Sequence, residues 1–172
     1  MRLFLSTLVI LILTTCLLVS ADDSAPKEKA EFLIKLVENI EWSDSGTGKT
    51  RPVQVAIVGS SPVTDELVRL SKEKNKVKVD VDEVSLSQEL SSYHVVFTPT
   101  DDLGQLAQLL KKVGNSKIFT VSSSKDFARY GIMVNLFQEK GKSKIKYELN
   151  KMVIDGAGLK LKNNFERKAE KI

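Results

Sequence analysis

Short β-branched runs alternate with helical patterns along most of this chain, and this alternation restricts the fold more than any other feature of the sequence. Strands buried on both faces are predicted for the continuous apolar runs VQVAIV, HVVFT and KIFTVS. Helical patterns precede the first run and lie between the later ones. A repeated strand–helix–strand order forms a mostly parallel sheet with helices on both faces and right-handed crossovers. We therefore expect a single-domain, three-layer α/β/α fold.

The predicted helices follow from capping residues and apolar spacing. In the first helix, Leu33, Leu36 and Val37 recur at helical spacing. A later helix is expected to be capped by Thr100, with two aspartates in its first turn. Its expected buried stripe is Leu103, Leu106, Ala107, Leu110 and Val113. In chain order, the expected helices cover about 26–41, 61–70, 85–92, 100–113 and 124–130, with a final helix from about 150.

Two parts of the chain alternate apolar and polar residues, as strands with one wet face do. The first is KVKVDVDEV at 76–84; the second comprises IMVNLFQ and KIKYELN, which are joined by a polar turn around Gly141. The second pair predicts an antiparallel hairpin at the end of the sheet. We expect both parts at the sheet edges, where their lysines discourage pairing with other chains.

The first 21 residues have the composition of a secretory signal peptide. They contain one positive charge at Arg2, no acidic residue and an apolar run over 3–13. We expect cleavage after Ala21, which leaves a domain of residues 22–172 in the periplasm. Two alternatives are an uncleaved membrane anchor, because the leader approaches spanning length, and lipid attachment at Cys16. The apolar residues after Cys16 disfavour lipid attachment.

Cysteine usage and charge limit the classes of protein and partner. Cys16 is the only cysteine, so the mature domain has no disulfide and depends on its core for stability. The chain has 26 basic and 22 acidic residues, and loss of Arg2 with the leader lowers the formal net charge from +4 to +3. This charge is too small to indicate a nucleic-acid partner. Basic residues concentrate after residue 139, where a solvated face is favoured over contact with an anionic membrane.

The segment SDSGTGKTRP at 43–52 nearly matches the phosphate-binding loop G-x-x-x-x-G-K-[ST], with Ser43 in place of the first glycine. That loop binds phosphates where it follows a strand and its lysine opens a helix. Here the segment follows a predicted helix and leads into a predicted strand, which is the reverse order. We therefore predict a polar connection that does not bind ATP.

The sequence contains little that indicates a catalytic or metal-binding site. His94 is the only histidine, and Asp80, Asp82 and Glu83 alternate along a predicted strand without a second acidic cluster nearby in sequence. No G-x-S-x-G nucleophile motif is present. We expect no catalytic residue, no metal and no cofactor.

Hydroxyl-bearing residues follow the three central predicted strands. Ligands of open parallel sheets bind beyond the carboxyl ends of the strands, so these residues suit a small polar or anionic ligand. Helix capping is the alternative explanation. The candidate ligand-binding residues are Ser60, Ser61, Thr98, Thr100, Ser122 and Ser123.

Five blocks of sequence resemble, in order and spacing, the YfiR family of exported bacterial regulators. They are KAEFLIKLVENIEW at 29–42, VAIVGSSP at 55–62, YHVVFTP at 93–99, TVSSSKDFARYGIMVNLF at 120–137 and KIKYELNKMVIDGAGLKLKNNF at 144–165. The resemblance implies a non-enzymatic periplasmic protein that restrains a membrane-bound signalling enzyme, in the best-known arrangement a diguanylate cyclase. It further implies that contact with the periplasmic sensor domain of the enzyme keeps cyclic di-GMP synthesis and biofilm formation low.

The resemblance also implies two further partners: an outer-membrane lipoprotein that relieves the repression and a second copy of the chain in a homodimer. Two departures from the family pattern are visible. Tyr93 stands where a cysteine is common, so redox control is not carried over, and Gly131-Ile132-Met133 replaces the usual Gly-Gly-Met. The alternative function is a periplasmic small-molecule binding protein that uses the strand-end hydroxyls.

Four residues within these blocks are candidates for binding a protein partner: Trp42, Phe127, Arg129 and Tyr130. Trp42 ends the first predicted helix beside a polar loop, where a large aromatic residue either closes the core or anchors an interface. The other three lie in a predicted short helix ahead of a strand. For them, interface and structural roles are equally supported by the sequence.

Overall fold

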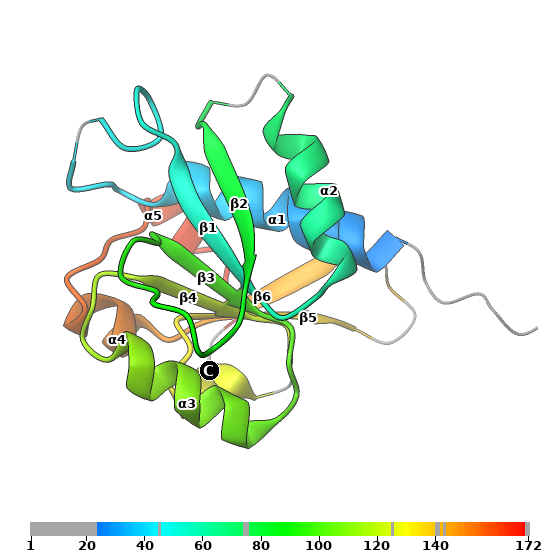
Figure 1. The fold of residues 1–172 in the computed structure, drawn as a ribbon, viewed down its shortest axis with the longest axis vertical. Coiled ribbons are helices and arrows are strands. Elements are labelled where there is room, and N and C mark those ends of the chain that lie inside the picture. Colours follow the sequence, from blue (N-terminus) through cyan, green and yellow to red (C-terminus); the bar gives the residue numbers. More distant parts are fainter. Residues whose placement is uncertain are drawn as a thin grey trace, which may run out of the picture.

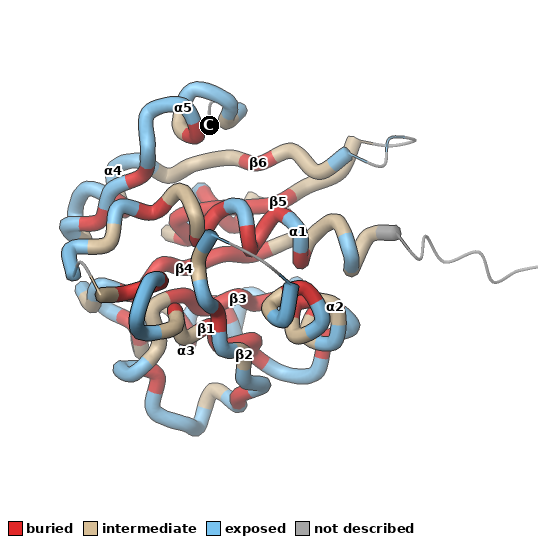
Figure 2. The backbone as a smooth tube through the Cα atoms, turned by 90° about the horizontal axis from the view of Figure 1, so that it is seen from above, coloured by how far each residue is buried: buried red, intermediate tan, exposed pale blue. Residues whose placement is uncertain are grey.

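Six strands of the described chain form one sheet, in the order β2-β1-β3-β4-β5-β6 (Figures 1 and 2). Strands β1 to β5 are parallel to one another, and β6 is antiparallel to β5. These pairings confirm a mostly parallel α/β sheet that ends in an antiparallel hairpin, with β2 and β6 at its edges. The strands are β1 (Val53–Val58), β2 (Val79–Val84), β3 (Val95–Thr98), β4 (Phe119–Ser122), β5 (Val134–Gln138) and β6 (Ile145–Leu149).

The computed structural model describes residues 24–44, 46–73, 76–124, 126–139, 142 and 144–170. The predicted signal peptide, with its alternative lipid site at Cys16, and the centre of the turn at Gly141 lie outside the described residues. Within the described ranges, no helix combines the length and the apolar character that crossing a membrane would require.

Helices cover both faces of the sheet. Helices α1 and α2 contact each other and pack on one face, while α3 and the 3₁₀ helix η1 pack on the other. This arrangement makes three layers. The helices are α1 (Ser24–Asn39), α2 (Pro62–Ser71), α3 (Leu103–Val113), η1 (Phe127–Tyr130), α4 (Lys151–Gly156) and α5 (Asn163–Glu166).

The central strands are buried on both faces, which explains their uninterrupted apolar sequences. In β1, Val55 and Ile57 join the core beneath α1 and α2, whereas Ala56 and Val58 join the core beneath α3. Successive residues of a strand point to opposite faces, so a strand between two helical layers needs apolar residues at every position. Figure 2 shows the buried positions concentrated along the inner strands.

The helix predicted near 85–92 is absent; the segment forms turns instead. Its polar side chains bond to the backbone amides of the segment itself: Gln88 Oε1 accepts from Ser85 N at 2.6 Å, and Glu89 Oε1 accepts from Ser91 N at 3.1 Å. Such local hydrogen bonds compete with those of a helix. Leu90 is buried and attaches the segment to the core.

Helix α3 forms where it was predicted but differs in its cap and in its buried face. Asp102 is the N-cap, because its Oδ1 accepts from Gln105 N at 2.9 Å, and Thr100 accepts from Asp102 N outside the helix. The prediction that Thr100 caps this helix was wrong. The buried residues are Leu106, Leu109 and Val113, whereas Leu103 is 56% exposed. Ala107 is also exposed and Leu110 is half-buried, so the predicted stripe combined two neighbouring faces of the helix.

Candidate functional site

The strand-end hydroxyls lie at one edge of the sheet, but several are already engaged within the protein. Ser61 Oγ accepts from Val63 N at 3.3 Å and caps α2. Thr98 is buried, and so is Ser122, whose hydroxyl donates to Asn135 Oδ1 at 2.5 Å. Ser60 is exposed and Ser123 half-buried. Helix capping and internal bonding therefore account for much of this cluster.

A carboxylate of the protein itself lies at the start of α2. Glu83 Oε1 accepts from the Thr64 hydroxyl at 2.7 Å and from Ser61 N at 3.2 Å. These two bonds, the Thr64 bond first, hold the pKa of Glu83 below its ordinary value. Negative charge is favoured at a helix N-terminus, and here Glu83 supplies it. An external anion would have to compete with Glu83 for the same donors.

The segment that resembles a phosphate loop connects α1 to β1. Gly46 O accepts from Thr50 N and Arg51 N, each at 3.0 Å, which folds residues 46–51 into tight turns. Strand β1 follows at Val53, and Lys49 is exposed. Among the described residues of this segment, no helix begins at this lysine to hold a phosphate.

Trp42 and His94 lie near the amino ends of the central strands, at the end of the sheet opposite to the strand-end hydroxyls. Their rings meet edge to face, with centroids 5.7 Å apart and planes at 82°. Gln54 N donates to His94 Nδ1 at 3.0 Å, so the neutral imidazole carries its proton on Nε2. Burial first, and then the charge of Arg51, lower the pKa of His94. His94 is thus a neutral structural residue that supports Trp42.

Trp42 lines two cavities. One, of about 200 Å³, is shared with His94, Lys117 and Leu159; the other, of about 380 Å³, includes Gly48. The indole Nε1 is buried and has no hydrogen-bond partner in the described part of the chain. A buried N–H without a partner is uncommon, so this atom is a candidate contact for a small acceptor.

The lowered pKa of His94 predicts a pH dependence of stability. A base whose pKa is lower in the folded state binds its proton more readily in the unfolded state. Its contribution is therefore fully present above the unfolded value of 6.5 and is lost as the pH falls through the folded value. We expect the midpoint of thermal unfolding to fall between about pH 7.5 and 5, where histidine is the main side chain to titrate.

His94→Gln tests this assignment, because the chain has no other histidine. The variant is expected to be less stable at neutral pH and to show a flatter pH profile over the same range. An unchanged slope in the variant would show that other groups cause the dependence.

The candidate partner-binding residues of η1 divide into buried and exposed ones. Phe127 is buried in the core beneath α3, so its role is structural. Arg129 is exposed and Tyr130 is 58% exposed. Ile132, which replaces a usual glycine of the resembling family, is fully buried in the same core as Phe127. Its side chain fills the interior rather than a surface pocket.

An open groove of about 760 Å³ runs between η1 and the C-terminal helices. Asn150 links its walls, because its Nδ2 donates to Ala128 O at 2.8 Å while its Oδ1 caps α4 through Val153 N at 3.2 Å. Met152, which follows Lys151 in the chain, is 81% exposed. The groove is lined by Ala128, Arg129, Leu149, Asn150, Lys151, Glu166, Arg167, Ala169 and Glu170.

The structure brings Arg129 and Tyr130 together on η1 but does not join them to Trp42. The two cavities beside Trp42 share no lining residue with the groove at Arg129. The sequence prediction missed Lys151 and Arg167, because the basic residues after 139 were interpreted as a solvated face. The sequence showed only that this segment is rich in charged residues, and charge density does not reveal a groove. The described residues contain no cluster of three metal-ligating side chains.

Three comparisons place this fold among known proteins. A family model described as YfiR/HmsC-like matches residues 26–165. No curated protein matches the chain. Among solved structures, the ABC domain in complex with L-Trp from Streptococcus pneumoniae shares 12% identity, with a TM-score of 0.56 over 85% of this chain. A conserved domain protein from Vibrio cholerae O1 biovar El Tor shares 13% identity, with a TM-score of 0.59 over 86% of this chain. The chain spans 60% of the length of each of these two structures, and at such identities they show the fold alone.

Proposed function

The chain belongs to the YfiR/HmsC-like family of periplasmic regulators, and we propose that it restrains a membrane-bound signalling enzyme by direct contact. The proposed target is the periplasmic sensor domain of a diguanylate cyclase, whose repression lowers cyclic di-GMP and biofilm formation. The chain would reach the periplasm through its N-terminal leader and be sequestered by an outer-membrane lipoprotein. The observation that carries this proposal is the family match over 140 residues, from 26 to 165.

The groove at η1, α4 and α5 is the proposed contact surface. Its lining combines the apolar residues Ala128, Leu149 and Ala169 with charged residues. Protein interfaces combine an apolar centre with a polar rim, and arginine is enriched among the residues that dominate binding. Arg129 and Arg167 are exposed at this surface and available to a partner.

Lys151 is paired with acidic residues of the chain, so Arg129 and Arg167 are the candidate contacts of the groove. Lys151 Nζ lies 3.2 Å from Glu166 Oε1 and 3.2 Å from Asp155 Oδ1, so its charge is matched within the chain. Arg129 makes a longer contact, with 3.9 Å between its Nε and Asp126 Oδ1. An acidic or carbonyl-rich segment of the sensor domain would fit beside Arg129 and Arg167.

Deletion of the gene in a strain that keeps its cyclases should raise cyclic di-GMP and surface attachment, and the wild-type gene should restore both. Unchanged cyclic di-GMP in the deletion strain would contradict the proposed function.

Arg129→Ala should weaken capture of the cyclase from solubilised membranes at least about tenfold, as loss of an interface arginine does.

Arg69→Ala is the matched control. Like Arg129, Arg69 is an exposed arginine paired with an acidic residue three positions earlier, but it lies on α2. It should bind the cyclase as the wild type does. Equal loss of binding in both variants would show a general charge effect and would remove the groove from the proposal.

The cavities beside Trp42 favour a second function, that of a small-molecule binding protein. The unpartnered Trp42 Nε1 lies near Gly48, which lines the cavity of about 380 Å³, and this site suits a small polar metabolite that accepts hydrogen bonds. Stabilisation by such a compound in a thermal-shift screen, lost in Trp42→Phe, would support this function. Stabilisation that persists in Trp42→Phe would direct attention to the strand-end hydroxyls instead.

A further inference from the structure

Strand β2 forms an open edge of the sheet. It pairs with β1 on one side, and no strand or bridge of the described residues pairs with its other side, which we call the β2 edge. Figure 2 shows β2 as the last strand of the sheet. At the opposite end of the sheet, the C-terminal segment covers part of β6, because Glu170 N donates to Tyr147 O at 2.9 Å. The β2 edge is therefore the more open of the two.

The backbone of β2 directs hydrogen-bonding groups toward this edge. Val53 N donates to Lys78 O at 2.8 Å, so the parallel ladder with β1 uses the even-numbered residues of this segment. The backbone groups of successive residues in a strand point to opposite sides. Those that point outward therefore belong to Val79, Val81 and Glu83. Unpaired groups of this kind are a template for the addition of another strand.

A groove of about 520 Å³ lies along the β2 edge and differs chemically between its two sides. Toward α2, Val81 packs against the core and Val68 is half-buried. Side chains alternate along a strand, so Asp80 and Asp82 project from the opposite face, where both are exposed. The groove is lined by Gln54, Val68, Ser71, Lys72, Val79, Asp80, Val81 and Asp82.

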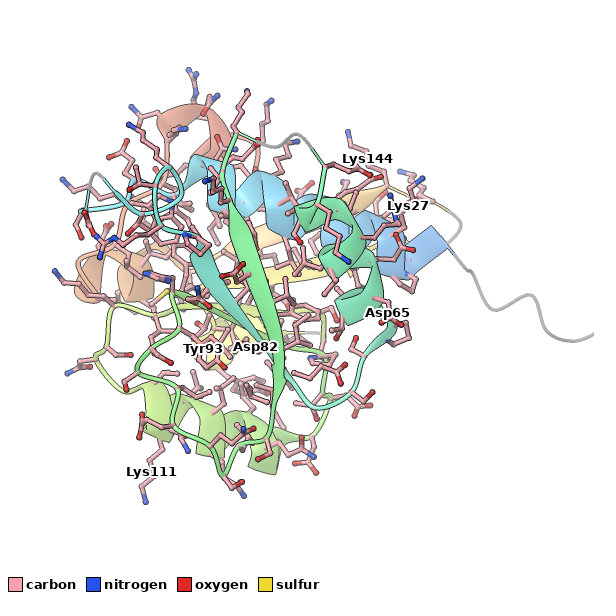
Figure 3. All side chains as sticks on the ribbon, turned by 45° about the horizontal axis from the view of Figure 1, so that its top comes forward. Lys27, Asp65, Asp82, Tyr93, Lys111 and Lys144 are labelled. Atoms are coloured by element: carbon pink, nitrogen blue, oxygen red, sulfur yellow. The ribbon has the colours of Figure 1, made fainter. Side chains whose placement is uncertain are left out.

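The two aspartates carry charge that the described residues do not match. Asp80 Oδ2 accepts from Gln54 Nε2 at 3.1 Å, and Asp82 Oδ2 accepts from the Tyr93 hydroxyl at 3.2 Å. Figure 3 shows Asp82 and Tyr93 side by side. These neutral donors orient the carboxylates. Neither aspartate forms an ion pair with a described residue, so both charges are available to a partner.

The charges of the β2 edge indicate which kind of strand it accepts. The lysines at 76 and 78, which the sequence suggested as guards of this edge, precede the strand, whereas the strand itself contains Asp80, Asp82 and Glu83. Two such edges from two copies of the chain would bring like charges together, which is destabilising. Basic side chains opposite the aspartates are stabilising by the same rule.

We propose that the β2 edge binds an extended, basic segment of a partner protein, which joins the sheet as an additional strand beside β2. Side chains on one face of paired strands lie opposite one another, so basic residues would face Asp80 and Asp82 while the alternate, apolar residues face Val81. The six residues of β2 span about 20 Å, which a segment of similar length covers.

This inference does not depend on the proposed function. The groove at the β2 edge shares no lining residue with the groove at Arg129. Arg129→Ala, which should weaken capture of the cyclase, is therefore expected to leave binding at the β2 edge unchanged.

The probe is an eight-residue peptide of alternating lysine and valine, blocked at both ends and fluorescently labelled. Fluorescence anisotropy measures its binding to the protein as the host cell processes it. Wild type should bind saturably below about 1 mM peptide. A peptide with four lysines followed by four valines, and one that alternates glutamate with valine, should each bind at least about tenfold more weakly, because they lack the alternation or the charge.

Methylation of alternate backbone amides tests the strand pairing. A bound strand turns every second amide toward β2 and the others away from it. Of two peptides, one methylated on its lysine amides and the other on its valine amides, one should bind like the unmodified peptide and the other at least about tenfold more weakly. Equal binding of the two would overturn the strand pairing.

Variants of the protein test the same contacts from the other side. Val81→Pro removes an outward N–H and should weaken binding at least about tenfold, while proline is tolerated at such edge positions. Asp80→Asn combined with Asp82→Asn removes both charges at exposed positions and should also weaken binding at least about tenfold. The matched control, Asp101→Asn combined with Asp155→Asn, removes two exposed aspartates elsewhere and should bind like the wild type.

Lys72→Glu provides a variant with a gain of binding, which a loss of folding cannot imitate. Lys72 is exposed in the same groove and repels a basic segment. Reversal of its charge should tighten peptide binding about threefold or more. Three results would overturn the proposal: a wild type without saturable binding up to about 1 mM peptide, an unchanged affinity in the Asp80 and Asp82 double variant, and no gain in Lys72→Glu.

Discussion

Phe165→Ala is expected to lower the free energy of unfolding by about 3–5 kcal/mol, the loss that follows removal of a large buried ring. Phe165 is only 2% exposed and joins three elements distant in sequence. Its ring lies 5.7 Å from that of Phe32 on α1 and 4.7 Å from that of Tyr147 on β6. Chemical denaturation, followed by circular dichroism, measures this loss. The ring holds the C-terminal helices against the sheet.

Tyr147→Phe is the control for this cluster. The Tyr147 hydroxyl donates to Phe165 O at 2.6 Å, and burial raises the pKa of Tyr147 to about 12, so the hydroxyl stays a donor at every relevant pH. The variant loses this bond but keeps the ring, which should cost about 1 kcal/mol. If Phe165→Ala were no more costly than Tyr147→Phe, α5 would contribute little to the stability of the domain.

Gly48→Ala is expected to destabilise the protein by about 1–3 kcal/mol, because Gly48 has φ +78°, a conformation that costs other residues this much. An added Cβ would also lie 2.7 Å from Val77 Cγ1. Gly48 N donates to Arg51 O, and Gly48 O accepts from Lys78 N ahead of β2. Thermal unfolding should show a lower midpoint.

Lys49→Ala is the matched control, one residue further in the same motif. Lys49 is exposed, so the variant should unfold like the wild type and repress normally. Gly48 would then be required for the backbone conformation of this segment. Lys49 would be required neither for folding nor for function. A folded but inactive Lys49→Ala protein would restore the interpretation of a phosphate-binding loop.

Much of the fold was predictable because its signals are local. The apolar run of β1, the proline after Ser61 at the start of α2 and Gly114 at the end of α3 each act within a few residues. The side-chain period of a strand and the capping of a helix do not depend on distant parts of the chain. The alternation of such elements then leaves few topologies.

The candidate sites were less predictable, because they depend on contacts between distant segments. The sequence placed Phe127, Arg129 and Tyr130 in one short helix and could not tell that the first is buried. It also gave no indication that Glu83, 22 residues after Ser61, binds the amide of that residue and lies at the start of α2. The groove at Arg129 exists because α4 and α5 return to η1, which only the folded chain shows.

By itself, the sequence determined the order and type of the main elements, the antiparallel end of the sheet and the family, since each rests on local periodicity or on motifs in order. The tertiary structure decided which face of α3 is buried, that 85–92 forms turns, and which of the polar and aromatic candidates are exposed. The physical reason is that burial depends on what the rest of the chain places against a surface. Helix α3 has apolar residues on two neighbouring faces, and the sheet can cover only one of them.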